Sequence, residues 1–217
     1  MWQISIIGAG GWGREVLAQM QSDIAFNKEW TVKGFLDNRP HVLDGYDCSL
    51  PILGDPLTYV PQPNDAFVCA VGDTRARHHY VQPLLRRNAL FIEIRTDCWL
   101  NPRVHLGRGC FLSPRVHVSP DVHIGAFANI HSQTVISHDV HLGDYCQIGA
   151  MVFVGGGVRI GRFAVVHPHA TLLPGIEVGE GATVGAGAVV VKDVPAGATV
   201  FGNPARVIFH APPEPNP

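Results

Sequence analysis

Between residues 94 and 190 an aliphatic residue recurs at every sixth position. A period of six matches neither the 3.6-residue turn of an α-helix nor the two-residue alternation of a hairpin strand. It indicates short parallel strands joined by sharp turns, with three strands to each triangular coil. We therefore predict a left-handed parallel β-helix of hexapeptide repeats over residues 94–200. The seventeen positions of this main column are Ile94, Leu100, Leu106, Leu112, Val118, Ile124, Ile130, Ile136, Leu142, Ile148, Val154, Ile160, Val166, Leu172, Val178, Val184 and Val190.

A second column of small or β-branched residues precedes the main column by two positions. Three of the five cysteines fall in it, and no CxxC pair is present, so we expect core packing and free thiols. Glycine often follows the main column, where a tight corner can require a positive φ. These glycines are Gly107, Gly125, Gly143, Gly149, Gly155, Gly161, Gly179 and Gly185.

The first 93 residues follow a different pattern, which predicts a small α/β domain. Strands are expected over residues 3–7, 31–36 and 65–71, and helices over residues 14–21 and 78–87. Gly8, Gly10 and Gly13 form a GxGxxG motif between a strand and a helix, the context that a nucleotide-binding loop requires. Asp37 ends the second strand, where an acidic residue commonly holds a ribose hydroxyl. This half of a Rossmann fold suits a mononucleotide, and the alternative is a glycine turn without a ligand.

Composition narrows the class of protein. A hydrophobic content of 46% is enough to fill a core. A net charge of −2 and a pI near 6.6 give no electrostatic case for nucleic-acid binding. No apolar run approaches the ~18 residues of a membrane span, and the N-terminus lacks a signal-peptide pattern. We expect a cytoplasmic protein with domains at 1–93 and 94–200 and a closing segment at 201–217. The proline-rich residues 212–217 are expected to be disordered.

The twelve histidines differ in their phase relative to the main column. His105, His123 and His141 lie one coil apart on the outward strand face and should form a ladder. His138 instead lies in a corner, two residues past the main column, and is followed by Asp139. A neutral imidazole there can take a proton from a nucleophile, and an adjacent carboxylate can orient it.

The corner one coil after His138 holds Gly156, within the run Gly155-Gly156-Gly157. Glycine leaves the backbone N–H groups open to a ligand, which is what an oxyanion site needs. His138 is then a candidate general base beside a candidate oxyanion site. The alternative is an ordinary turn histidine next to a glycine turn.

Four features together resemble the bacterial sugar acyltransferases of the sialic-acid O-acetyltransferase-like family. They are the hexapeptide solenoid, the small GxGxxG domain, Val135-Ile136-Ser137-His138-Asp139 and Gly202-Asn203-Pro204-Ala205. The chain is similar to the members that N-acetylate UDP- or GDP-linked 4-amino sugars, as in bacillosamine and perosamine synthesis. The resemblance covers nearly the whole chain. It implies a homotrimeric, acetyl-CoA-dependent N-acetyltransferase for surface-glycan synthesis that requires no metal.

The resemblance also implies a role for particular residues. His138 corresponds to the general base, Asp139 to its acidic partner, and the amide of Gly156 to the group that polarises the thioester carbonyl. Acetyl-CoA is implied to lie between neighbouring subunits, at Gly155, Gly156 and Ala186. The nucleotide sugar is implied to bind at Gly10, Gly11, Trp12, Asp37, Asn38, Gly72 and Asp73. Transfer should be direct, because no cysteine or serine nucleophile accompanies the base.

Two departures from the family pattern concern substrate recognition. Trp12 stands where a histidine is common in the glycine loop, which puts contacts to the nucleotide there in question. Gln147 stands where the bacillosamine-type enzyme has a second histidine, so the resemblance does not identify that particular sugar.

Three alternative functions follow from the same residues. One is O-acetylation of a sialic-acid-like sugar, and another is a binding or scaffold protein without turnover. The third is a zinc enzyme that resembles γ-type carbonic anhydrase, whose ligands fall at n, n+36 and n+41. His105 and His141 satisfy the first interval and Cys146 does not supply the third ligand. His131 and His167 likewise satisfy it, and Leu172 fails.

Overall fold

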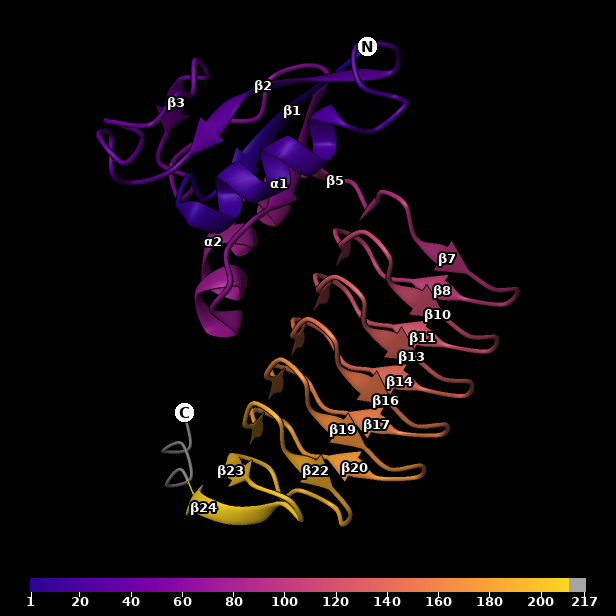
Figure 1. The fold of residues 1–217 in the computed structure, drawn as a ribbon. Coiled ribbons are helices and arrows are strands. Elements are labelled where there is room, and N and C mark those ends of the chain that lie inside the picture. Colours follow the sequence, from indigo (N-terminus) through magenta and orange to yellow (C-terminus); the bar gives the residue numbers. More distant parts are fainter. Residues whose placement is uncertain (211–217) are drawn as a thin grey trace. The chain divides into compact units, whose positions relative to one another are not determined.

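The computed structural model describes residues 1–210 and divides the chain into two compact units (Figure 1), Met1–Thr96 and a second unit that begins at Asp97. The first unit contains a five-stranded parallel sheet in the order β3-β2-β1-β4-β5. Its elements are β1 (Trp2–Ile7), α1 (Gly11–Gln21), β2 (Trp30–Leu36), β3 (Ile52–Gly54), β4 (Asp65–Cys69), α2 (Thr74–Arg86), β5 (Leu90–Phe91) and β6 (Ile94–Arg95).

Both helices begin earlier than the sequence pattern predicts. The structure starts α1 at Gly11, with Gly10 as an N-cap that makes no side-chain hydrogen bond. It starts α2 at Thr74, because the Asp73 carboxylate accepts a hydrogen bond of 2.7 Å from the Ala76 N–H and caps the helix. The short edge strand β3 was not predicted. Its length of three residues, between Pro51 and Pro56, leaves little periodic signal.

The core of the first unit lies around β1. Ile4, Ile6 and Ile7 of this central strand are fully buried, as are Val16 and Met20 of α1. Because β1, β2 and β4 are parallel, their carboxyl ends meet at one edge of the sheet. That edge is where doubly wound sheets bind ligands, at the point where the strand order reverses.

The second unit is a stack of triangular coils built from two-residue strands (Figure 1). The β7 face contains β7 (Trp99–Leu100), β10 (His117–Val118), β13 (Val135–Ile136), β16 (Phe153–Val154), β19 (Thr171–Leu172) and β22 (Val189–Val190). The β8 face contains β8 (His105–Leu106), β11 (His123–Ile124), β14 (His141–Leu142), β17 (Arg159–Ile160) and β20 (Glu177–Val178). The β9 face contains β9 (Phe111–Leu112), β12 (Asn129–Ile130), β15 (Gln147–Ile148), β18 (Val165–Val166), β21 (Thr183–Val184), β23 (Ala198–Phe201) and β24 (Arg206–His210).

The predicted parallel β-helix is confirmed, and the main column forms its core. Every member from Leu112 to Val190 is buried, while Leu100 and Leu106 in the first coil are only partly buried. Burial of one such aliphatic side chain contributes about 1.5–3 kcal/mol. Thr134 is the polar member of the second column, and its hydroxyl donates to the Gly149 carbonyl oxygen at 2.7 Å. The core therefore accepts this hydroxyl without leaving it unpaired.

The glycines that follow the main column do not serve the purpose predicted for them. The expectation of a positive φ is wrong, because the left-handed residue of each corner comes two positions later, as at Asp121 and Asp139. The glycines are needed for close approach of the coils instead. A Cβ on Gly125 would lie 2.5 Å from the backbone nitrogen of Asp144, and one on Gly143 would lie 2.5 Å from that of Arg162.

The last described segment closes the solenoid. The motif Gly202-Asn203-Pro204-Ala205 connects β23 to β24, which pair antiparallel, and the Asn203–Pro204 peptide is cis. The expected disorder of residues 212–217 falls outside the described residues. Within residues 1–210, neither helix has the length and hydrophobicity that a membrane span requires.

Candidate active site

His138 lies in the corner that joins β13 of the β7 face to β14 of the β8 face. Proline occupies the equivalent position in neighbouring coils, at Pro102, Pro120 and Pro174. Asp139 adopts the left-handed φ of 61° that this corner requires, a conformation that aspartate tolerates better than most residues. The His138 side chain is 68% exposed in the single chain.

The imidazole of His138 is oriented by its neighbour. Its Nδ1 lies 2.7 Å from Oδ2 of Asp139. A carboxylate can only accept, so Nδ1 carries the hydrogen and donates it. In the neutral ring the lone pair is then on Nε2, the nitrogen that can take a proton from a substrate. The predicted pair of His138 and Asp139 is therefore brought together in the geometry of a general base.

Gly156 lies directly against this ring. A Cβ at position 156 would stand 2.7 Å from Cε1 and 2.8 Å from Nε2 of His138. The N–H of Gly157 donates to the His138 carbonyl oxygen at 2.9 Å, which links the two corners. Within residues 1–210 the Gly156 N–H makes no hydrogen bond. Proline at the equivalent corners has no N–H, so this corner offers a donor that those at positions 102, 120 and 174 lack.

The other two residues predicted to bind acetyl-CoA lie in different places. Gly155 is adjacent to Gly156, and a Cβ on it would meet the backbone nitrogen of Pro174 at 2.6 Å, so coil stacking already requires a glycine there. Ala186 is exposed in the corner between β21 and β22, which is a different corner from that of His138. One chain by itself does not bring Ala186 to His138.

The histidine ladder forms as predicted along the β8 face. The rings of His105 and His123 stack with centroids 4.6 Å apart, and those of His123 and His141 with centroids 4.9 Å apart. The described part of the chain contains no group of three or more histidine, cysteine or acidic side chains that could hold a metal ion. Cys146, which the zinc alternative would need near His141, is fully buried in the solenoid core. The Cys146 thiol therefore does not lie on the outward face with the ring of His141, as this alternative would require.

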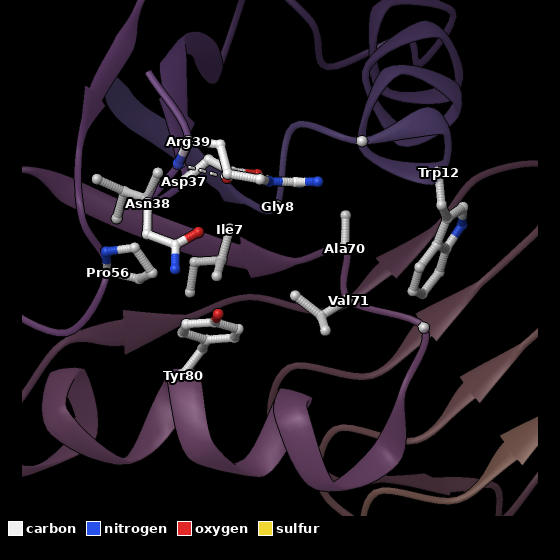
Figure 2. A pocket seen from close by; sticks show the side chains of 13 residues that line it. Ile7, Gly8, Trp12, Asp37, Asn38, Arg39, Pro56, Ala70, Val71 and Tyr80 are labelled. Carbon is white, nitrogen blue, oxygen red and sulfur yellow. Dashed lines mark hydrogen bonds and ion pairs between the residues drawn. The ribbon is translucent and has the colours of Figure 1, made fainter. Parts of the chain in front are cut away.

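A second candidate site is a cavity of about 290 Å³ in the first unit (Figure 2). It lies at the carboxyl edge of the sheet, and it includes five of the residues predicted for the nucleotide sugar. Gly11 and Asp73 do not line it, and Asp73 instead caps α2. Its lining residues are Ile7, Gly8, Gly10, Trp12, Leu36, Asp37, Asn38, Arg39, Pro56, Ala70, Val71, Gly72 and Tyr80.

Several lining residues were missed by the sequence analysis. Arg39 follows the end of β2 by three residues, Pro56 follows β3, and Tyr80 belongs to α2. Because the carboxyl ends of parallel strands share an edge, the segments after β2 and β4 were the places to search. Arg77 of α2 is fully buried, and its Nε donates to the Val71 carbonyl oxygen at 2.9 Å, so it helps to hold the wall of the cavity.

Asp37 is the acidic residue that lines this cavity, and its carboxylate accepts four hydrogen bonds. Burial opposes its ionisation, but hydrogen bonds from the Arg39 side chain and the Ala9 N–H outweigh that effect and lower the pKa of the Asp37 carboxyl. An ion pair of 2.9 Å between Arg39 Nη2 and Asp37 Oδ2 acts in the same direction. The carboxylate thus stays ionised over the physiological range.

This lowered pKa predicts an acid-dependent stability of the first unit. The contribution of Asp37 is complete above the ordinary carboxyl pKa of about 4 and is lost as the pH falls through the lower folded value. Asp37→Asn should be less stable than the wild type at neutral pH by about 1–3 kcal/mol. The difference should shrink as the pH falls below the ordinary carboxyl pKa of about 4 and through the lower folded value. Urea unfolding followed by circular dichroism of α1 and α2 measures it, and a pH-independent difference would contradict the assignment.

The comparisons with known proteins agree with this architecture. Residues 3–84 match the model of the PglD N-terminal domain, and residues 121–156 and 157–192 match that of the bacterial transferase hexapeptide, six repeats. A comparison with curated protein sequences gave no match.

Solved structures with the same architecture cover nearly the whole chain. A mutant of perosamine N-acetyltransferase from Caulobacter crescentus, in complex with CoA and GDP-perosamine, has a TM-score of 0.86 and 28% identity, covering 96% of this chain and 98% of that one. The acetyltransferase domain of PglB from Neisseria gonorrhoeae FA1090, in complex with acetyl coenzyme A, has a TM-score of 0.85 and 27% identity, covering 95% and 98%. WeeI from Acinetobacter baumannii AYE has a TM-score of 0.75 and 28% identity, covering 96% and 100%.

Fold, domain composition and site together define the class of protein. The chain is a hexapeptide-repeat acyltransferase with a PglD-type N-terminal domain. The resemblance to the nucleotide-amino-sugar N-acetyltransferases, which the sequence motifs indicated, is confirmed.

Proposed function

We propose that this protein transfers an acetyl group from acetyl-CoA to the amine of a nucleotide-linked amino sugar. The observation that carries this proposal is the His138–Asp139 pair set against the unbonded N–H of Gly156. The Caulobacter crescentus relative was solved with CoA and GDP-perosamine, which supports both substrate classes. The cavity at the end of β1, β2 and β4 is the proposed site of the nucleotide sugar.

The transfer is direct in this proposal. The sugar nitrogen attacks the thioester carbonyl carbon, so that a C–N bond forms and the C–S bond then breaks. Nε2 of His138 removes the amine proton and returns it to the departing thiolate, which leaves as CoA thiol. The Gly156 N–H donates to the oxyanion that develops on the carbonyl oxygen. Asp139 keeps the imidazole in the required tautomer and supports its positive charge.

The acceptor assignment is tested by kinetics on a panel of UDP- and GDP-linked amino sugars. Gly10→Val leaves the free protein intact, because a Cβ there meets only the Arg39 guanidinium, at 3.9 Å, and φ is −68°. The added side chain would stand where the phosphates approach the glycine loop, so the KM of the nucleotide sugar should rise about tenfold or more. The affinity for acetyl-CoA should not change.

Two outcomes would contradict this scheme. A loss of acetyl-CoA affinity alone in Gly10→Val would mean that the two substrates are assigned to the wrong units. Mass spectrometry and amide-specific hydrolysis of the product separate N- from O-acetylation, and an alkali-labile ester would favour the sialic-acid-like alternative.

We place the reaction in the cytoplasm, where both substrates are made, and cell fractionation of the host checks this location.

A homotrimer is part of the same proposal. The outward residues of the β7 face are largely apolar, with Trp99 71% and Phe153 43% exposed in the single chain. The β8 face presents histidine, arginine and glutamate instead. Exposed apolar side chains that continue along one face favour burial against another protein surface. Packing of three β7 faces would also bring corners of different chains together, as the assignment of Ala186 to acetyl-CoA requires.

Sedimentation equilibrium tests this assembly. Three chains of 23.5 kDa give a particle of about 70 kDa, and Trp99→Glu combined with Phe153→Glu should shift it towards the monomer with loss of turnover. The matched control is His123→Glu on the β8 face, which should remain a trimer. His117→Glu would not serve, because His117 lies on the β7 face itself. A fully active monomer would contradict the shared site.

A further inference from the structure

The carboxylate of Asp37 has no acceptor capacity left for a ligand. Its Oδ2 accepts from the Ala9 N–H and from Nη2 of Arg39, both at 2.9 Å. Its Oδ1 accepts from the Arg39 backbone N–H at 3.0 Å and from Arg39 Nε at 2.9 Å. A carboxylate offers about four lone-pair sites. The Asp37 residue is also only 7% exposed. A ribose hydroxyl could bind it only by displacing one of these four donors.

The Arg39 guanidinium, by contrast, is open to a ligand. Its side chain is 62% exposed although it is fixed to Asp37 through two parallel hydrogen bonds. Those bonds use two of the five N–H groups of the guanidinium, and within residues 1–210 the other three donate no hydrogen bond. The paired geometry holds the cation still, so less side-chain entropy is lost when it binds.

The guanidinium lies beside the start of α1. Its Nη2 is 3.9 Å from the position of a Cβ on Gly10, and Figure 2 shows the side chain extending over the glycine loop. The first turn of α1 contains no acidic residue, and Gly10 provides no side-chain cap. The N-terminus of α1 and the Arg39 cation therefore act on one region of the cavity. Both favour an anion there.

The other side of the cavity is uncharged. Figure 2 shows Asn38 and Tyr80 pointing toward one another on the side away from Trp12, with Pro56 next to them. An amide, a phenol and an apolar proline ring suit the neutral parts of a nucleotide, namely its base and ribose. The charge of the ligand must then lie towards Arg39 and the glycine loop.

We propose that Arg39 binds the diphosphate of the nucleotide sugar, and that Asp37 is a positioning residue that holds Arg39 and does not accept a ribose hydroxyl. This proposal rests on the proposed function of the cavity as the nucleotide-sugar site. Asp37 accepts from Ala9 of the glycine loop and from Arg39 with the same carboxylate. One acid thus sets the distance between the two phosphate-binding elements.

Calorimetric titration of the full chain with UDP, GDP, uridine and guanosine tests the assignment. One of the two nucleoside diphosphates is expected to bind the wild type. Arg39→Ala should lower the affinity for that diphosphate by about ten- to hundredfold. Affinity for the corresponding nucleoside should change by less than about twofold, because its binding involves no phosphate. Arg39→Lys should recover only part of the loss, since it keeps the charge without the fork. Arg86→Ala, at the exposed end of α2, is the matched control and should bind as the wild type does.

Asp37→Asn distinguishes positioning from direct contact. If Asp37 only holds Arg39, the loss should again be confined to the diphosphate and should be smaller than that of Arg39→Ala. The affinity of the wild type for the diphosphate should decline with added salt, and this decline should be shallower in Arg39→Ala, which lacks the cation. Equal losses of nucleoside and nucleoside diphosphate in Asp37→Asn would overturn the proposal in favour of ribose binding. An unchanged diphosphate affinity or salt dependence in Arg39→Ala would overturn it as well.

Failure of the underlying function looks different. A wild type that binds neither UDP nor GDP at millimolar concentration would remove the nucleotide site itself, and this proposal with it. A wild type that binds one of them while the Arg39 variants are unaffected leaves the proposed function standing and rejects only the role of Arg39.

Discussion

His138→Ala is expected to fold like the wild type and to lose roughly 10²–10⁴ in kcat, the usual contribution of a positioned general base. The exposed His138 side chain is not part of the main column that holds the coils together. The substitution should therefore lower kcat and leave the stability of the fold unchanged. Single-turnover kinetics with saturating acetyl-CoA and acceptor measure it. Asp139→Asn should lose less, because it removes only the orienting charge and leaves Nε2 in place.

The chain offers a matched control for this substitution. His41 and Asp44 form another exposed histidine–carboxylate pair, with Nδ1 3.2 Å from Oδ2, but this pair lies outside both candidate sites. His41→Ala should keep wild-type turnover and stability. If His138→Ala also keeps wild-type turnover on the true acceptor, then another group removes the proton and the proposed mechanism is wrong.

Gly156→Ala should lose about 10²–10³ in kcat, comparable to the loss of one oxyanion donor, while the fold is retained. The methyl group would lie 2.7–2.8 Å from the imidazole, so the ring of His138 must rotate away. It would also stand beside the N–H that is proposed to meet the thioester oxygen. Gly156 does not have a positive φ, so alanine brings no backbone strain and the effect reports contact alone.

Gly175→Asn provides the comparison for Gly156→Ala. Position 175 belongs to the same type of corner one coil later, has φ of 75° and has no atom within 4 Å of an added Cβ. Asparagine tolerates this conformation better than most residues, so activity and melting temperature should stay near those of the wild type. Wild-type kcat in Gly156→Ala, with the ring of His138 unmoved in its structure, would contradict the role given to this glycine.

The sequence by itself determined the solenoid and the position of His138, the proposed base. A six-residue phase kept from Ile94 to Val190 predicts stacked three-strand coils, and these coils bury every member of that column from Leu112 to Val190. The same phase places His138 in a corner and Gly156 in the corner one coil later. Such contacts can be predicted from the sequence, because residues one coil apart stack on each other and each coil contacts only its neighbours.

The tertiary structure alone decided the rest of the site and the purpose of several glycines. The glycines after the main column lie against the backbone of the next coil. No local sequence pattern encodes how closely the two coils approach one another. Arg39, Pro56 and Tyr80 reach one cavity from three segments of the α/β unit, because parallel strands bring their carboxyl ends to a common edge. Asp37 is acidic as the motif predicts, but four donors from Ala9 and Arg39 occupy its carboxylate. A motif specifies which groups are present, and only packing decides which of them remain free to bind.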